Sequence, residues 1–165
     1  MATFLSGLTS GAISVLSTST IVSLSTDDFA DLTSDQVLGL TTKQLSVLKI
    51  SQVKAISADG IAALTTSQIN QGLTTAQLAA LTMEQVSRLT TDQVVALSTA
   101  QVQSLTTDQI QALTTTQVAA LGTRDIAVLS TAQVAALTID QVQQGLTTDQ
   151  VVACLLYTSP SPRDS

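Results

Sequence analysis

Large apolar residues recur along this chain with a period of eight. The stretch LTTDQVVA occupies residues 89–96 and returns unchanged at residues 146–153. Position one of the unit is Leu everywhere except at Ile56, and position six is always large and apolar. Eighteen consecutive units can be aligned in this way, beginning at residues 8, 16, 24, 32, 40, 48, 56, 64, 73, 81, 89, 97, 105, 113, 121, 129, 137 and 146. The array accounts for nearly the whole chain.

The polar positions of the unit are as regular as the apolar ones. Position two is Ser or Thr in every unit except at Lys49 and Gly122, and position five is Gln in thirteen units. Ala is the commonest residue at position eight, with eight of the eighteen units, and two units carry a ninth residue, which is Gly72 in one and Gly145 in the other. Any fold for this chain must explain the period and these polar positions together.

The period of eight excludes the simplest regular structures. A continuous α-helix turns about 100° per residue, so an apolar stripe would drift by roughly 80° from one unit to the next. Supercoiling cannot correct this drift, because eight residues over two turns would require about 4.0 residues per turn. A plain strand would point positions one and six to opposite faces of its sheet. One long helix, a coiled coil and a plain strand are therefore all disfavoured.

The unit makes sense if each one starts a new short helix. With Thr90 as the N-cap, Gln93 falls at the third helical position and completes a capping box. Leu89 and Val94 then occupy the two positions of a hydrophobic staple. Asp at position four, as in Asp92, lies in the first turn, where a carboxylate interacts favourably with the helix dipole. We expect Gly72 and Gly145 to end helices in the left-handed conformation and to mark kinks in the array.

Helices this short are unstable alone, so neighbouring units must share one core. The sequence therefore predicts an all-α solenoid, or superhelix, of very short capped helices, one per eight-residue repeat, with two units per coil. The alternative is a β-solenoid, since Thr, Val and Ile favour strands; an ice-binding Thr array would depend on that fold. The predicted domains are a lead-in at 1–7, one solenoid at 8–153 and a non-native or disordered tail at 154–165.

Composition removes most catalytic chemistry. The chain has no His, and its one Cys, Cys154, lies outside the repeats. Nucleophilic dyads and His-based metal sites are therefore not available. Four carboxylates gather near the start of the array and could be considered as a cation site, but their spacing does not match a calcium-binding loop: Asp27, Asp28, Asp31 and Asp35. We predict no enzymatic activity, no catalytic residues, no metal site and no cofactor.

Charge and hydropathy bear on partners. Six basic residues against twelve acidic ones give a net charge of −6, which opposes nucleic-acid binding. Lys43, Lys49 and Lys54 are close in sequence and are interpreted as a solvated face. No apolar run approaches the roughly 18 residues of a membrane span, and the amino terminus lacks the basic region of a signal peptide. We expect neither nucleic acid nor membrane insertion.

The carboxyl-terminal stretch CLLYTSPSPRDS departs from the repeat and holds both prolines. From Cys154 to Asp164 it resembles the translation of an adapter used in transposase-based sequencing libraries. That resemblance implies a metagenomic fragment whose natural chain continues past Ala153. The alternative interpretation is a genuine disordered Ser/Pro tail.

Over residues 8–153 the octad resembles the L-[ST]-T-x-Q-[VI]-x-A tandem arrays of very large bacterial secreted or cell-surface proteins, some of them adhesin-like. The resemblance implies a spacer or scaffold outside the cell, whose partners are the neighbouring domains of a longer parent chain. A single unit is also similar to the start of the first helix in repeats of transcription activator-like effectors. That likeness is limited to capping chemistry, because the second helix and the base-reading residues are missing.

The alternative function is a binding scaffold for a protein or glycan ligand. Its surface would be formed by the variable positions three, four and seven, which are mostly Thr, Ala, Asp, Ser, Val and Gln. The aromatic and Arg side chains that dominate binding hot spots are rare there, which favours the spacer.

Overall fold

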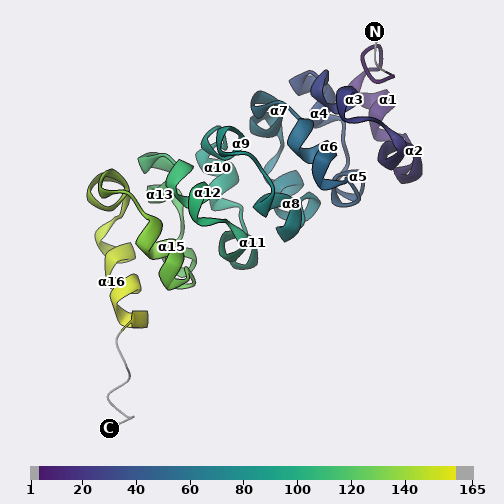
Figure 1. Cartoon of the computed structure of the whole chain (residues 1–165). Helices are drawn as coiled ribbons and strands as arrows, with labels where there is room; N and C mark the ends of the chain where they lie inside the picture. Colours follow the sequence, from purple (N-terminus) through teal and green to yellow (C-terminus); the bar gives the residue numbers. More distant parts are fainter. Residues whose placement is uncertain (1–3, 159–165) are drawn as a thin grey trace.

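The repeats fold into one all-helical superhelix (Figure 1). The computed structural model describes the backbone of residues 4–158 and the side chains of residues 4–154. Within that part of the chain there is no β-strand, so the predicted all-α solenoid is confirmed and the β-solenoid is wrong. The elements in chain order are α1 (Ser10–Ser14), α2 (Thr18–Ser23), α3 (Thr26–Ala30), α4 (Ser34–Leu38), α5 (Thr42–Ser46), α6 (Ile50–Ala55), α7 (Ala58–Ala63), the π-helix η1 (Gln68–Gly72), α8 (Thr75–Ala79), α9 (Met83–Ser87), α10 (Thr91–Val95), α11 (Thr99–Ser104), α12 (Thr107–Ala112), α13 (Thr115–Ala120), α14 (Thr123–Ala127), α15 (Thr131–Ala136), the π-helix η2 (Gln141–Gly145) and α16 (Thr148–Thr158).

Each octad forms one helix of about a turn and a half, and its limits follow from the sequence. In α10 the N-cap is Thr90, whose backbone is extended with φ −72° and ψ 158°. The Thr90 hydroxyl accepts from the Gln93 amide over 3.2 Å, and Gln93 Oε1 accepts from the Thr90 amide over 2.9 Å. The same reciprocal pair occurs in every unit that combines Ser or Thr at position two with Gln at position five.

The Leu at position one separates consecutive helices. Leu105 has an extended backbone, with φ −61° and ψ 135°, and its amide donates to the carbonyl of Val102. The next residue, Thr106, is already the N-cap of α12. One residue therefore ends a helix and precedes the cap of the next, which is why the units follow each other without a linker.

Successive units wind with between three and four units per superhelical turn. Helices three units apart pack together, as α4 does with α7 and α10 with α13. Hydrogen bonds from the Gln side chains reach four units back, as from Gln93 in α10 to α7. The prediction of two units per coil is therefore wrong. The capping signal is local and carries no information on the coil, and three inward-facing side chains per unit need the wider interior that the larger coil provides.

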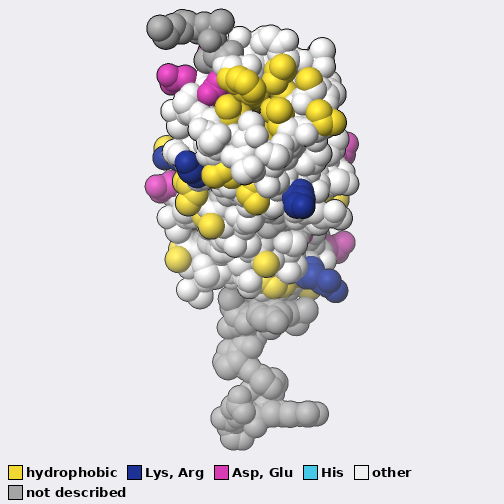
Figure 2. All heavy atoms as spheres, turned by 90° about the vertical axis from the view of Figure 1, so that its right-hand side faces the viewer, with side chains coloured by type: hydrophobic (Ala, Val, Ile, Leu, Met, Phe, Trp, Pro, Cys, Tyr) yellow, Lys and Arg dark blue, Asp and Glu magenta, His cyan; other side chains and the backbone are white. Residues whose placement is uncertain are grey.

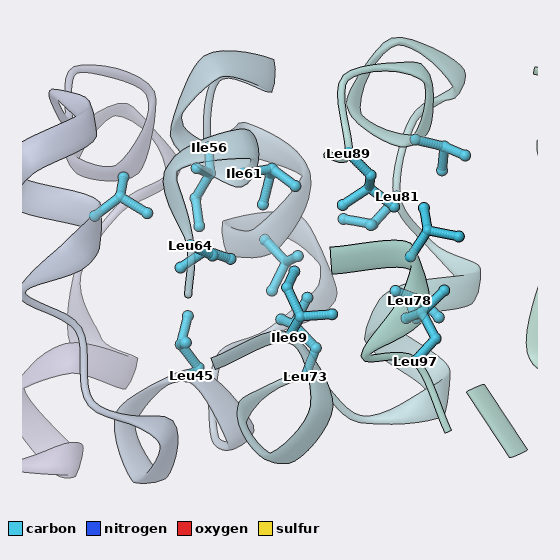
Figure 3. Close-up of a cluster of buried hydrophobic side chains, with 14 of the residues drawn as sticks. Leu45, Ile56, Ile61, Leu64, Ile69, Leu73, Leu78, Leu81, Leu89 and Leu97 are labelled. Carbon is cyan, nitrogen blue, oxygen red and sulfur yellow. The ribbon is translucent and has the colours of Figure 1, made fainter. Parts of the chain in front are cut away.

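Positions one and six form a continuous core along the superhelix. From the unit at residue 32 to the unit at residue 113, these side chains are at most 5% exposed. Figure 3 shows the central part of this cluster, in which Leu45, Ile61, Ile69 and Leu78 from different units point into the shared interior. Each unit thus buries its apolar pair only by contact with other units, as in other solenoids.

The two inserted glycines correct another expectation. No described glycine has a positive φ, so Gly72 and Gly145 do not end helices in the left-handed conformation. Their units instead form π-helices, which accommodate one extra residue in a turn. The Leu73 amide accordingly donates to the carbonyl of Gln68, five residues earlier.

The insertions also leave the superhelix unkinked, contrary to our expectation. Gln77 bonds to the carbonyls of Leu45 and Leu48 across the first insertion, and Gln150 bonds to that of Val118 across the second. Small size explains the choice of glycine, because a Cβ on Gly72 would lie 3.0 Å from Leu45 Cδ1.

At the two ends of the array, the structure describes part of the predicted lead-in and part of the predicted tail. Of the lead-in at residues 1–7, residues 4–7 lie in the superhelix, and Leu5 is fully buried as position six of a partial unit. Of the tail at residues 154–165, the first five residues continue α16, because no Leu-Thr cap interrupts the helix after Ala153. Residues 159–165 lie outside the described part of the chain.

Candidate functional site

The acidic residues near the start of the array do not form a metal site. Asp28 is buried and accepts from the amide of Ser25 (3.0 Å), the hydroxyl of Ser25 (2.7 Å) and the amide of Phe4 (2.7 Å). The Ser25 hydroxyl is the largest cause that holds the pKa of Asp28 below its usual value. Asp27, Asp31 and Asp35 are exposed. Within residues 4–154, no group of three or more His, Cys, Asp or Glu side chains is placed to hold a metal ion.

The basic residues lie on the surface. Lys43, Lys49 and Lys54 are all exposed, and Arg88 forms an exposed 3.8 Å ion pair with Asp59. Figure 2 shows Lys and Arg scattered among acidic and uncharged side chains on one face of the molecule. Among the helices of the described residues, none combines the length and the hydropathy of a membrane span.

The feature that the fold does build is a ladder of buried glutamines at position five. Gln93 is 2% exposed, and its Nε2 donates to the carbonyls of Ile61 (3.0 Å), Ala62 (3.1 Å) and Leu64 (2.6 Å) at the end of α7. The last carbonyls of a helix lack the regular intrahelical partner, although that of Ile61 also accepts from the Leu64 amide over 3.2 Å. Because its Oε1 accepts from the Thr90 amide, one side chain satisfies the start of α10 and the end of α7.

The same link recurs throughout the array. We call the set of linking glutamines at position five the glutamine ladder. Each Gln at position five is buried and donates to carbonyls between 28 and 32 residues earlier. The donors other than Gln93 are Gln36, Gln44, Gln52, Gln68, Gln77, Gln85, Gln101, Gln109, Gln117, Gln133, Gln141 and Gln150.

Sequence reasoning assigned position five only to the cap, although a signal for the second role was present. Glu and Gln serve equally as the acceptor of a capping box. Position five is never Glu in this chain, although Glu84 shows that the residue occurs one position earlier. The use of Gln in thirteen units and of Glu in none indicates that the amide N–H groups have a partner, which the structure identifies as the carbonyls four units back.

Within the described residues, Gln36 is the first glutamine of the ladder. Gln36 donates to the carbonyls of Leu5 and Leu8, which lie 31 and 28 residues earlier. The three units before it carry Ala12, Thr20 and Asp28 at position five.

Asp125 interrupts the ladder further along. It is 9% exposed, and its Oδ2 accepts from the Gly122 amide over 3.2 Å. Burial raises the pKa of Asp125, against smaller opposing effects of the Gly122 amide and Arg124. By the spacing of neighbouring units its targets would be the carbonyls of Val94 and Leu97, to which an ionised carboxylate has no hydrogen to donate.

Apolar side chains are exposed at both ends of the described superhelix, as they are at single positions such as Met83 and Val95 along it. At the amino-terminal end Phe4 is 58% and Val15 82% exposed, and Figure 2 shows hydrophobic side chains gathered towards the top of that view. At the other end, two adjoining cavities of about 390 and 200 Å³ share Ile126, Leu129 and Val134 in their linings.

These features define a class of protein: an all-α solenoid of octapeptide repeats whose helix ends are linked through buried glutamines. The model of the ALTTAQ repeat matches residues 71–99, 91–123 and 118–153, which together span half of the chain. The chain therefore belongs to the ALTTAQ repeat family. No curated protein and no solved structure matches it.

Proposed function

We propose that this chain is a non-catalytic structural repeat region that holds the neighbouring domains of a longer bacterial secreted or cell-surface protein apart. The observation that carries the proposal is the glutamine ladder, which runs from Gln36 to Gln150 with interruptions at Gly60 and Asp125. It makes every superhelical turn depend on the turn before it. Such a ladder supports a rod whose length is set by the number of octads.

The outer surface also favours a spacer over a binding scaffold. The residues at positions three, four and seven in α10 are Thr91, Asp92 and Val95, all exposed. Arg88 and Arg124 are the described arginines, and neither lies beside an exposed aromatic side chain in its own or the adjoining units. Binding hot spots are usually built from clustered aromatic and Arg side chains. A protein or glycan ligand is therefore the weaker alternative.

The spacer role is tested by changing the number of units. A copy of residues 89–120, which contains four complete octads, is inserted after Ala120, and small-angle scattering gives the maximum dimension. We expect each such insertion to lengthen the particle by the same step without lowering the melting temperature. A four-residue insertion at the same point is the matched control, and it should destabilise the fold because it breaks the register. A particle that thickens or unfolds on addition of complete octads would refute the spacer.

A further inference from the structure

The carboxyl-terminal end of the superhelix exposes residue positions that are buried elsewhere. At position six, Val142 and Val151 are 45% and 38% exposed, whereas Val94 and Val118 are fully buried. At position one, Leu137 is only partly buried. Together with Ile126, Leu129 and Val134, these side chains line the two cavities described above. We call this set the terminal face.

The terminal face also presents helix ends that receive no ladder bond. Throughout the array, the carbonyls of positions six and one are the targets of the Gln four units later. In the described part of the chain, no Gln side chain donates to the carbonyls of Ile126 and Leu129 or of Val134 and Leu137. The residues after Ala153 contain no further octad that could supply these donors.

We propose that the terminal face is a docking surface for a further superhelical turn, made of octads that carry Gln at position five. The interface is a continuation of the one between successive turns, in which the start of one helix meets the end of another four units earlier. The segment would supply two things that the face lacks. Its Leu and Val side chains would fill the cavities, and its Gln side-chain N–H groups would donate to the carbonyls of these helix ends.

A second copy of this chain fits the terminal face less well. Its leading turn presents Ala12, Thr20 and Asp28 at position five. Ala has no hydrogen-bonding group, and both oxygens of Asp28 already accept from Ser25 and Phe4. Stacking of two copies would cover apolar surface and would not supply the Gln side-chain donors of the ladder. The position-five glutamines therefore identify the partner as a further set of octads. This inference goes beyond the spacer role, because it says what the terminal face binds.

The test extends the full chain at this face. A copy of residues 89–120 is placed between Ala153 and Cys154, so that Gln93, Gln101, Gln109 and Gln117 are repeated beyond the terminal face. The matched control carries Glu at the four copied positions, which keeps the cap acceptors and removes the donors. Amide hydrogen exchange is then followed in residues 121–153.

We expect the Gln extension to slow exchange in residues 121–153 at least tenfold relative to the unextended chain, and the Glu extension to do so far less at neutral pH. Equal protection by both extensions, or by neither, would overturn the proposal. Sedimentation of the unextended chain tests the second copy. A monomer is expected, whereas a dimer that dissociates on Val142→Lys would show that another copy occupies the face and would also overturn the proposal.

Discussion

The side-chain amide of Gln93 donates to the backbone carbonyl of Leu64 over 2.6 Å, although 29 residues separate them in the chain. The same side chain accepts from the amide of Thr90, three residues before it. One side chain therefore both caps the start of its own helix and bonds to the end of a helix in the preceding superhelical turn. Units three and four apart are neighbours in the superhelix, just as residues three and four apart are neighbours on the surface of an α-helix.

Removal of a single N-cap should have a modest effect. Thr90→Ala takes away the hydroxyl that accepts from the Gln93 amide, and we expect it to lower the free energy of unfolding by about 1 kcal/mol. The control is Thr91→Ala at the exposed position three, where Ala should be neutral or slightly stabilising as the better helix former. Urea unfolding measures both, and equal losses would contradict the assignment of Thr90 as the cap.

Repair of the ladder at Asp125 should stabilise the protein in a pH-dependent way. Burial raises the pKa of Asp125 above the ordinary 3.8 in the folded chain. The contribution of Asp125 to stability is therefore complete below the unfolded pKa and is lost as pH rises through the higher folded pKa. Asp125→Gln should thus raise the melting temperature more at about pH 7 than at about pH 3.

The physical reason for this gain is twofold, since the substitution removes a buried charge and supplies a donor towards the carbonyls of Val94 and Leu97. Asp125→Asn removes the charge with a shorter side chain and should recover only part of the gain. Melting curves of the three proteins at both pH values test this. A gain from Asp125→Gln that does not vary with pH would show that ionisation of Asp125 plays no part.

Close packing between turns predicts an effect at Gly39. A Cβ at this position would lie 2.6 Å from the Cα of Ser10, which is backbone and cannot rotate away. Gly39→Ala should therefore destabilise the protein by about 1 to 3 kcal/mol, although Ala is the commonest residue at position eight. Gly11→Ala is the control, because its Cβ would meet nothing nearer than Thr9 Oγ1 at 3.9 Å. It should stabilise helix α1 by up to about 1 kcal/mol, and a Gly39→Ala protein as stable as the control would refute the close approach.

The parts of the fold that could be predicted from the sequence are those set by neighbouring residues. Thr90 and Gln93 are three positions apart, so one unit suffices to predict a helix start there. The number of units per turn depends on contacts between units, and nothing within an octad determines it. The role of Gly72 was mispredicted for a related reason, because the glycine is explained by its closeness to Leu45 and Thr42, 27 and 30 residues earlier, and not by a left-handed helix end.

In the glutamine ladder, too, the local role could be predicted from the sequence and the long-range partners could not. The acceptor role of Gln93 follows from its spacing to Thr90, and its donor role could have been inferred from the absence of Glu at position five. The identity of the acceptors could not, since it requires the coil geometry that brings the end of α7 to the start of α10. The terminal face likewise becomes visible only when Val142 and Val151 are compared with their buried equivalents.

The central claim is that the amide donors of position five hold successive turns together, and the free energy of unfolding of Gln93→Glu at neutral pH tests it most directly. Glu keeps the acceptor for the Thr90 amide but directs a buried carboxylate at the carbonyls of Ile61 and Leu64. We predict a loss of about 3 kcal/mol or more, partly recovered at low pH when the carboxyl can donate, and almost no loss for Gln111→Glu on the exposed surface. A Gln93→Glu protein no less stable than Thr90→Ala would show that the cap alone explains the glutamine and would contradict the ladder.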